Sequence, residues 1–278
     1  MTVTIQWVKD MSSVKLLGGL SGCEVILEKD ATVTKITNSN EYNERLINQG
    51  NKQSLFSKFI LKNIDTPKVL EIGENFIRME YVEAKNFNDF LKYATNKDIF
   101  FITDSLCGYI EFLKNRSRPS NVNTNLVIRR KVESLRDKTK HINVIDRLLS
   151  KLDSLNSNEI PHTFCHGDLT FSNILFHKNR LYFIDFLDTF MDSYILDLVK
   201  LKQDLFYNWS SKTQRINNIR IHQSKRYIWE KIYNNNKEII ESEWFDFFNI
   251  LNILRIEPYI QNDIQRNVLD NIVEEFKL

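Results

Sequence analysis

The sequence is poor in cysteine and in net charge, and it has no long apolar run. Its three cysteines, Cys23, Cys107 and Cys165, are odd in number, which argues against a disulfide framework and for a reducing compartment. The 38 basic and 36 acidic side chains leave a net charge of +2, so bulk electrostatics favours neither nucleic acid nor a membrane surface as a partner. No apolar run approaches the ~20 residues that span a bilayer, and the first residues lack the basic start and apolar core of a signal peptide. We therefore expect a cytoplasmic protein without a membrane span.

Glycine is also scarce, but the rest of the composition is that of an ordinary globular protein. The chain has 278 residues, of which 42% are hydrophobic and 12% aromatic. This is enough for one large domain or two lobes with a substantial core. Composition leaves the oligomeric state open.

The polar groups best suited to chemistry are concentrated in residues 162–188. This stretch contains His166-Gly-Asp168, Asn173 five residues later and Asp185 another twelve residues on. Apolar runs on both sides of a turn at 177–180 predict a loop followed by a short hairpin, which would hold Asp168, Asn173 and Asp185 close together. Phosphoryl transfer needs one carboxylate to accept the proton of the attacking hydroxyl, and oxygen ligands to hold magnesium. The alternative is a solvated polar hairpin without a catalytic role.

The pattern HxDxxxxN, followed by a strand and Ile184-Asp-Phe186, resembles the aminoglycoside phosphotransferase and choline kinase family, which are small-molecule kinases with a protein-kinase-like fold. The likeness to the protein-kinase catalytic loop is looser, because His-Gly-Asp replaces His-Arg-Asp. The resemblance implies that Asp168 is the catalytic base, that His166 braces its loop, and that Asn173 and Asp185 bind Mg²⁺. It also implies ATP or GTP as the phosphate donor.

Three of the seven glycines, Gly18, Gly19 and Gly22, separate two predicted strands at 13–17 and 23–27. A glycine-rich turn lets backbone N–H groups approach phosphate oxygens, although a tight turn without a ligand would use glycines too. The resemblance implies that Ser21 and Gly22 contact the nucleotide phosphates.

A third predicted strand, 31–36, carries Lys35 between apolar neighbours. Such a lysine faces solvent in most strands, but here it matches the phosphate-holding lysine of the family. That lysine normally pairs with a glutamate on the next helix, which we expect at 40–61. The matching position falls near Gln53, and Glu44 is the alternative partner, so the sequence leaves this pairing open.

Two more strands are expected at 68–72 and 76–82, and the second resembles the strand and hinge that hold adenine in the family. The resemblance implies that Met79 forms the back of the adenine pocket. The carbonyl of Glu80 and the N–H of Val82 would contact the adenine edge. A position of Met79 in the hydrophobic core is compatible with this role.

The rest of the chain is expected to be helical. An amphipathic helix at 96–114 is followed by another at 126–155 that is broken near 139–143. The resemblance gives Asp197 the role of bracing the catalytic loop. Asp188 and Asp192 are either metal or acceptor contacts, or turn and N-cap residues.

The C-terminal part should select the acceptor, and its charges are segregated. Residues 212–231 contain six Lys or Arg and one Glu, whereas 238–275 contain nine Asp or Glu and two Arg. The basic run would suit an anionic acceptor such as a sugar phosphate, and the acidic run an aminoglycoside or choline. Either run is more often a solvated surface. Trp209 or Trp244 could stack on a substrate, although core packing is more common.

Together these features predict an α+β, bilobal protein-kinase-like fold. An N-terminal antiparallel sheet lobe (1–82) would bind the nucleotide, and a larger, mostly helical C-terminal lobe (83–278) would bind a small hydroxyl-bearing acceptor. The predicted activity is Mg²⁺-dependent transfer of the γ-phosphate, with a sugar, amino alcohol or cell-surface precursor as the preferred acceptor class. The alternatives are an aminoglycoside-modifying kinase, a protein kinase-like enzyme and a catalytically silent nucleotide-binding module.

Overall fold

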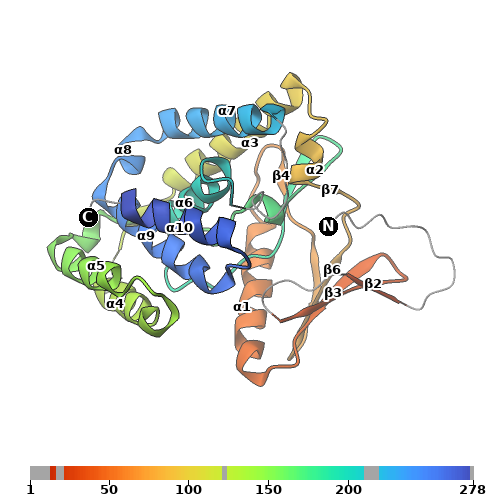
Figure 1. Cartoon of the computed structure of the whole chain (residues 1–278). Coiled ribbons are helices and arrows are strands. Elements are labelled where there is room, and N and C mark those ends of the chain that lie inside the picture. Colours follow the sequence, from red (N-terminus) through yellow and green to blue (C-terminus); the bar gives the residue numbers. More distant parts are fainter. Residues whose placement is uncertain (1–12, 17–21, 121–123, 210–218, 276–278) are drawn as a thin grey trace. The chain divides into compact units, whose positions relative to one another are not determined.

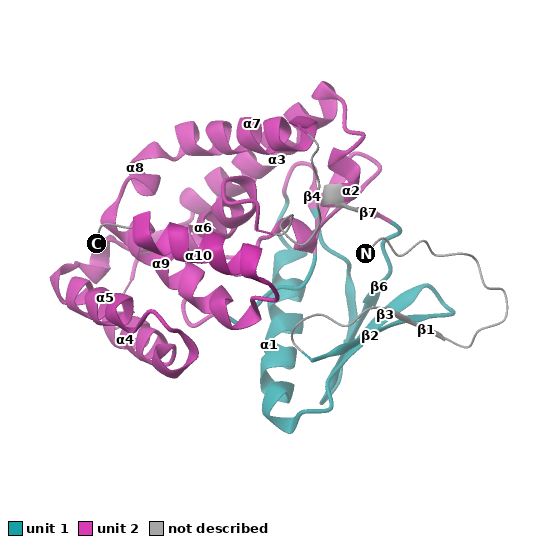
Figure 2. Cartoon of the chain, viewed as in Figure 1, with its two compact units in different colours: residues 1–60, 65–83, 184–188 teal, residues 61–64, 84–183, 189–278 magenta. Residues whose placement is uncertain are grey.

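The computed structural model describes residues 13–16, 22–120, 124–209 and 219–275 (Figure 1). The chain divides into two compact units, which Figure 2 distinguishes by colour. Unit 1 covers residues 1–60, 65–83 and 184–188, and unit 2 covers residues 61–64, 84–183 and 189–278. The short segment Ile184–Asp188 therefore joins unit 1, although the chain on both sides of it belongs to unit 2.

Unit 1 is an antiparallel five-stranded sheet with one helix, as the sequence predicts. The strand order is β1-β2-β3-β6-β5. Helix α1 packs against β5 and β6. The elements are β1 (Ser13–Leu16), β2 (Glu24–Glu28), β3 (Thr32–Ile36), α1 (Asn40–Phe56), β5 (Val69–Ile72) and β6 (Phe76–Glu80).

Helix α1 comes very close to the sheet at Gly50. A Cβ atom at this position would lie 3.0 Å from Cδ1 of Ile72 and 3.1 Å from Cδ1 of Ile77. The missing side chain therefore sets the spacing between helix and sheet. The helix ends at Phe56, five residues before the predicted end at residue 61.

Unit 2 is mostly helical, with a small sheet of short strands in the order β4-β11-β10-β7. None of the helices in the described part of the chain has the length and hydrophobicity to cross a bilayer. The strands are β4 (Ile64–Asp65), β7 (Lys85–Asn86), β8 (Arg118–Pro119), β9 (Pro161–His162), β10 (Ile174–His177) and β11 (Arg180–Phe183). The helices are α2 (Phe87–Leu91), α3 (Asn96–Lys114), α4 (Thr124–Glu133), α5 (Ile142–Ser154), α6 (Tyr194–Leu205), α7 (Ile219–Asn235), α8 (Lys237–Ile240), α9 (Glu243–Ile256) and α10 (Asp263–Glu275).

Helix α3 has the predicted bounds for local reasons. Thr95 accepts a hydrogen bond from the Asp98 N–H at 3.2 Å, and the Asp98 carboxylate accepts one from the Thr95 N–H at 2.7 Å, which forms a capping box. The apolar face that the sequence predicts is buried throughout, at Ile99, Ile102, Leu106, Tyr109, Ile110 and Leu113.

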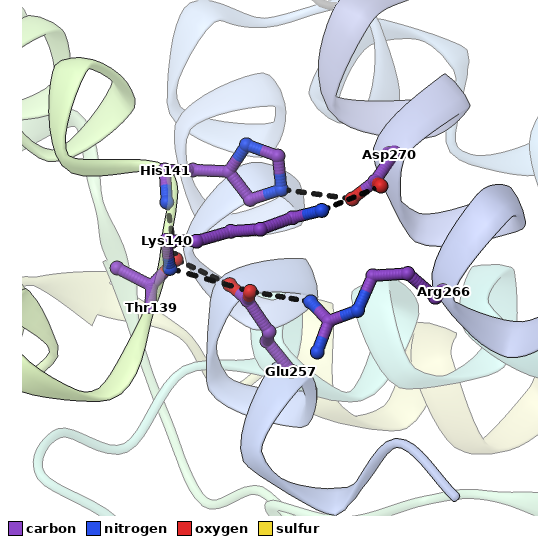
Figure 3. A network of polar contacts seen from close by, with 6 residues as sticks. All are labelled: Thr139, Lys140, His141, Glu257, Arg266 and Asp270. Atoms are coloured by element: carbon purple, nitrogen blue, oxygen red, sulfur yellow. Dashed lines mark hydrogen bonds and ion pairs between the residues drawn. The ribbon is translucent and has the colours of Figure 1, made fainter. Parts of the chain in front are cut away.

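The predicted break near 139–143 separates α4 from α5, and a polar network fastens it to the C-terminal helices (Figure 3). The buried Glu257 accepts hydrogen bonds from the Thr139 hydroxyl, the Lys140 N–H at 3.3 Å and Arg266 at 2.6 Å. Asp270 pairs with Lys140 at 2.7 Å. A carboxylate that accepts several donors resists displacement, so these contacts fix the end of α9 against α5.

Helices α6 and α9 form the centre of unit 2. Every residue of α6 except Lys202 is buried, including Asp197, Lys200 and Asp204. Trp244 at the start of α9 is buried, donates to the Asn156 carbonyl at 3.0 Å and stacks on Phe248. Trp244 is therefore a core residue, and the hypothesis that it stacks on a substrate is wrong.

The predicted hairpin after the loop that carries Asp168 is formed by β10 and β11. Ile174 pairs with Phe183 at one end, and the other end is closed by a two-residue turn. Lys178 and Asn179 both have positive φ, 45° and 59°, as a turn that matches the twist of paired strands requires.

Candidate active site

The loop that carries Asp168 is braced by a carboxylate from α6. The Asp197 side chain is fully buried and accepts from the N–H groups of His166 and Gly167, each at 2.8 Å, and from the Tyr109 hydroxyl at 2.8 Å. Gly167 has φ +85°, a conformation that L side chains rarely adopt, which explains why glycine stands before Asp168. The bracing role that the resemblance implied for Asp197 matches these contacts.

The His166 side chain also contacts the loop and is shielded from solvent. Its side chain is fully buried, and its Nδ1 accepts from the Asp168 N–H at 3.2 Å. The ring packs edge-on against Phe183 of β11. These contacts suit the bracing role that the sequence suggested for His166.

Asp168 and Asn173, which the sequence predicts to lie together, are in direct contact. The Asn173 Nδ2 donates to Asp168 Oδ2 at 2.9 Å and to the Asp168 carbonyl at 2.8 Å. Because both donor contacts go to Asp168, the carboxamide oxygen of Asn173 remains as an acceptor that can serve a metal ion.

A buried lysine outside the predicted motifs completes this group. Lys200 Nζ lies 2.9 Å from Asp168 Oδ1, and only 9% of the Lys200 side chain is exposed. Burial raises the pKa of Asp168, but the charge of Lys200 and its hydrogen bond outweigh burial and hold the pKa below its ordinary value. Asp168 is therefore ionised at neutral pH, as a proton acceptor must be.

Lys35 lies on the central strand β3 of unit 1 and is buried. Its Nζ forms an ion pair with Asp185 and donates to Gln49 Oε1 at 3.1 Å. Gln49 is the residue next to Gly50, where α1 approaches the sheet. The lysine–aspartate pair brings together two of the predicted site residues within unit 1.

The expected partner of Lys35 on α1 was Gln53 or Glu44, and this was wrong. Gln53 lies one turn further along α1 and donates to the Pro67 carbonyl at 2.7 Å. Glu44 is exposed. Gln49, which makes the contact with Lys35, lies one helical turn before Gln53.

The segment that carries Asp185 is held by α1. Phe186 packs on Phe56 with ring centroids 4.9 Å apart, and Lys52 donates to the Leu187 carbonyl at 3.0 Å. Asp185 itself has φ +62°, an uncommon backbone conformation that functional residues often adopt. That Asp185 also lies close to Asp168 and Asn173 remains a prediction.

The two other aspartates of this region accept hydrogen bonds from side chains, Asp188 from a distant part of the chain and Asp192 from a near neighbour. Asp188 accepts from Asn48 of α1 at 3.3 Å, and Asp192 accepts from the Thr189 hydroxyl at 2.6 Å. Cys165 is buried with its Sγ 3.4 Å from Asp192. Asp192 thus shows the turn role that was one of its two alternatives.

The predicted nucleotide contacts lie at three places in unit 1. Gly22 is exposed with φ +75°, whereas Ser21, Gly18 and Gly19 lie outside the described residues. Met79 is paired with Val33 and Val69 in the sheet, and β6 ends at Glu80, two residues before Val82. Their contacts with adenine remain predictions.

The basic run at 212–231 is not one solvated face. Lys225 is fully buried, with its Nζ 5.4 Å from the ring centre of Phe171, and burial lowers its pKa. Arg226 is exposed and pairs with Glu230 at 2.8 Å. Lys212 and Arg215 lie outside the described residues.

Sequence reasoning missed Lys200 and Gln49, although one signal pointed to Lys200. It follows Asp197 by three residues in a run that is otherwise apolar, Tyr194-Ile-Leu-Asp-Leu-Val-Lys200. Charged residues in such a helix are buried with partners, because an unpaired buried charge is very unfavourable. Gln49 carries no comparable signal.

The oxygen donors present suit magnesium. The carboxylate of Asp185 and the carboxamide oxygen of Asn173 are hard ligands of the kind Mg²⁺ takes from proteins, and Mg²⁺ usually keeps several waters besides. Only one Asp185 oxygen, Oδ1, is in the pair with Lys35.

Part of the chain also matches a known family in sequence. Residues 111–231, which include the loop, the hairpin and Asp185, match the model of the phosphotransferase enzyme family, APH. No curated protein matches the chain in sequence.

Several solved structures share the fold at low sequence identity. The streptomycin–ATP ternary complex of APH(2")-IIa is 12% identical with a TM-score of 0.61, covering 96% of this chain and 92% of that one. Choline kinase LicA from Streptococcus pneumoniae is 15% identical with a TM-score of 0.60, covering 95% and 92%. A glucosamine kinase is 10% identical with a TM-score of 0.55, covering 91% and 76%.

The chain therefore has the protein-kinase-like fold of small-molecule phosphotransferases, which confirms the predicted fold class. The family match and the structural neighbours together confirm the predicted resemblance to the aminoglycoside phosphotransferase and choline kinase family.

Proposed function

We propose that this protein transfers the γ-phosphoryl group of ATP or GTP to a hydroxyl of a small molecule in a Mg²⁺-dependent reaction. The observation that carries the proposal is that Asp168, on a loop braced by Asp197, contacts both Asn173 and Lys200 of α6. A solvated polar hairpin would have no reason to hold a carboxylate ionised beside a buried lysine. The preferred acceptor is a sugar, an amino alcohol or a cell-surface precursor.

Asp168 is the proposed catalytic base. It orients the acceptor hydroxyl and takes its proton while the oxygen attacks the γ-phosphorus and the nucleoside diphosphate leaves. Lys200 keeps the carboxylate ionised for this step. Because phosphoryl transfer leaves little covalent work for the protein, most of the rate would come from positioning and from charge stabilisation.

The N-terminal part, residues 1–82, would hold the nucleotide together with Asp185. Lys35 would bind the α- and β-phosphates, Ser21 and Gly22 the phosphates through the glycine turn, and the backbone of Glu80 and Val82 the base beside Met79. Asn173 and Asp185 would hold Mg²⁺, which when bound neutralises charge on the phosphate oxygens.

A nucleotide-consumption assay tests the proposal. Mg·ATP and Mg·GTP are offered with a panel of sugars, amino alcohols, nucleosides and aminoglycosides, with Asp168→Asn as the control and nucleotide binding measured in parallel. Acceptor-dependent turnover that Asp168→Asn lacks supports the proposal. Nucleotide binding without any turnover favours a silent binding module, a peptide panel then tests for a protein kinase-like enzyme, and failure to bind nucleotide refutes the proposal.

A further inference from the structure

A small cavity in unit 2 adjoins the loop that carries Asp168. It lies between Gly167 of that loop, Lys200 of α6 and Asn252 of α9, with Phe190 and Phe248 among its apolar walls. Its volume of about 10 Å³ is enough for one water-sized group. The cavity can therefore take one functional group of a ligand, and the hydrogen-bonding atoms of its lining decide which group fits.

The orientation of the Asn252 amide follows from the buried lysine. Lys200 can only donate hydrogen bonds, and its Nζ lies 3.4 Å from Gln203 Oε1, so the side-chain oxygen of Gln203 must face the lysine. The same oxygen accepts from Asn252 Nδ2 at 2.8 Å. The amide nitrogen of Asn252 is therefore fixed toward Gln203, and the Asn252 Oδ1 is turned away from it.

The Asn252 Oδ1 is an acceptor that still requires a donor. Asn252 is only 3% exposed, and this oxygen is buried without a hydrogen-bond partner in the described part of the chain. Among the described residues that line the cavity, Asn252 has the only side-chain oxygen. Buried acceptors are normally satisfied, so this oxygen is suited to a donor group of a ligand.

Lys200 supplies the complementary donor. An ammonium group has three N–H groups, and the described residues give Lys200 two acceptors, Asp168 Oδ1 at 2.9 Å and Gln203 Oε1. One N–H remains, on a side chain that lines the same cavity as Asn252. A hydroxyl both donates and accepts, whereas an ammonium only donates and a carboxylate only accepts. The lining therefore matches a hydroxyl group.

We propose that this cavity is a subsite of the acceptor site that takes a second, non-reacting hydroxyl, so that the acceptor is a polyhydroxy compound such as a sugar or a polyol. The inference rests on the proposed function, because the cavity belongs to an acceptor site only if Asp168 is the base. The second hydroxyl donates to Asn252 Oδ1 and accepts from Lys200, while the reacting hydroxyl meets Asp168. Asn252 is then a specificity-determining residue.

This subsite narrows the acceptor classes. An amino alcohol that placed its ammonium in the cavity would bring three N–H groups to one side-chain oxygen, and a buried ammonium with too few acceptors is unfavourable. An alcohol with a single hydroxyl would leave Asn252 Oδ1 without a donor. Sites that hydrogen-bond a substrate hydroxyl discriminate strongly against the analogue that lacks it.

The test removes one ligand hydroxyl and the Asn252 amide, separately and together. Protein saturated with Mg·ADP, so that the nucleotide site is filled, is titrated with glucose, ribose and glycerol and with their monodeoxy and monoamino analogues. Binding is followed by thermal melting, and phosphoryl transfer to each compound is measured separately with Mg·ATP. We expect loss of the hydroxyl that enters the cavity to weaken binding about tenfold, as the loss of one hydrogen bond to a buried partner does. The amino analogue at the same carbon should bind no better than the deoxy analogue.

Asn252→Leu removes the amide and keeps a side chain of similar shape. It should weaken binding of the full compound about tenfold and abolish the difference between this compound and its deoxy analogue, because the hydroxyl has lost its partner. Asn249→Leu is the matched control. Asn249 lies three residues earlier on α9 and is also buried with an Oδ1 that has no partner among the described residues, but it does not line the cavity. This control should leave the difference unchanged.

Val199→Ile is a second variant, and it keeps the polar side chains intact. Val199 is buried and lines the cavity, so the added carbon reduces the space for a ligand group. Binding of the full compound should weaken more than binding of the deoxy analogue. The KM for Mg·ATP should be unaltered in all three variants.

Equal binding of full and deoxy compounds in wild type, or a difference that persists in Asn252→Leu, overturns the inference and means that the cavity holds only water. Tighter binding of the amino analogues, an equal loss in Asn249→Leu, or absence of binding by every compound at tens of millimolar also overturns it. Transfer only to acceptors with a single hydroxyl would overturn the inference and leave the proposed function standing. Hydroxyl binding that depends on Asn252, without transfer to any acceptor, would do the reverse.

Discussion

Lys35 with Asp185 in unit 1, and Lys200 with Asp168 in unit 2, are the same kind of ion pair in different surroundings. The two lysines are similarly buried, with 10% and 9% of the side chain exposed. The aspartates differ: 40% of the Asp185 side chain is exposed against 27% for Asp168. Asp168 is also held by Asn173, on a loop whose N–H groups are bonded to Asp197.

This difference indicates that the two ion pairs have different roles in the proposed reaction. An ion pair with one solvated partner contributes roughly 0–1 kcal/mol, so it can open at little free-energy change when phosphate and metal arrive. A carboxylate fixed by a buried lysine and an amide keeps one position and one charge state. We therefore expect the pair in unit 1 to exchange partners during turnover and the pair in unit 2 to remain closed until the base accepts its proton.

Replacing each aspartate with asparagine should give the largest difference in effect between the two ion pairs. Asp168→Asn should lower kcat by about 10²–10⁴ with nucleotide affinity unchanged, because only the proposed proton acceptor is lost. Asp185→Asn should weaken Mg·nucleotide binding itself, because a proposed metal-binding carboxylate is lost. Turnover and nucleotide titrations measure both effects. Similar nucleotide affinities for the two variants would contradict the proposed difference between the two ion pairs.

Removing the Asp197 carboxylate, which braces the loop that carries Asp168, should reduce the stability of the protein. Asp197→Asn should lower the free energy of unfolding by about 3 kcal/mol, because the buried carboxylate accepts three hydrogen bonds and the amide cannot replace it at each. Tyr109→Phe, which removes only one of the three donors, should lower it by about 1 kcal/mol. Urea unfolding gives both values. Wild-type stability and turnover in Asp197→Asn would show that the loop does not depend on this carboxylate.

Removing the lysine of each pair should affect different measurements. In Lys200→Met, burial continues to raise the pKa of Asp168 while the opposing charge is gone, so the acid limb of kcat/KM moves to higher pH. Lys200→Arg should restore much of the wild-type profile. Lys35→Met should raise KM for the nucleotide without moving this limb. An unshifted acid limb in Lys200→Met would mean that Lys200 only supports the fold.

The ion pair between Lys200 and Asp168 makes the stability of the protein depend on pH. Because the pKa of Asp168 is lowered in the folded state, its contribution to stability is present above the unfolded pKa, about 4, and is lost as pH falls through the folded pKa. The stability difference between wild type and Lys200→Met should therefore be largest near neutral pH and shrink in acid. Urea midpoints measured at both pH values test this.

The smallest effect is expected from charging the amide partner of Lys35. Gln49→Glu should change the KM for nucleotide by less than about fivefold, which corresponds to the roughly 0–1 kcal/mol of such pairs. Glu44→Gln is the control, since Glu44 is exposed and should have no effect on nucleotide binding. A change in Glu44→Gln that exceeds the one in Gln49→Glu would restore Glu44 as the partner of Lys35.

Much of the fold was predictable because its signals are local. The capping box and apolar face of α3 act within one helix, and the two-residue turn sets the register of β10 and β11. The five-stranded sheet followed from alternating short strands and turns. For the site, the spacing of Asp168 and Asn173 placed them together, since only five residues separate them.

The partners that set the chemistry of these residues lie far away in the chain. Gln49 contacts Lys35 because Gly50 lets α1 approach the sheet, and this contact lies one helical turn from the position near Gln53 that the resemblance indicated. The sequence leaves open whether Trp244 stacks on a substrate or packs in the core, because periodicity does not reveal what an aromatic ring packs against.

By itself the sequence predicted most of the elements and the kinase-like order of its motifs, and it indicated candidate residues for phosphoryl transfer. Local hydrogen bonding and hydrophobic periodicity are contained in short stretches, which is why the predictions of the elements succeed. Only the tertiary structure decided that Lys200 holds Asp168, and it showed the hydrogen bonds by which Asp197 braces the loop. These contacts join residues 30–88 positions apart, and their distances depend on how α6 packs in the core.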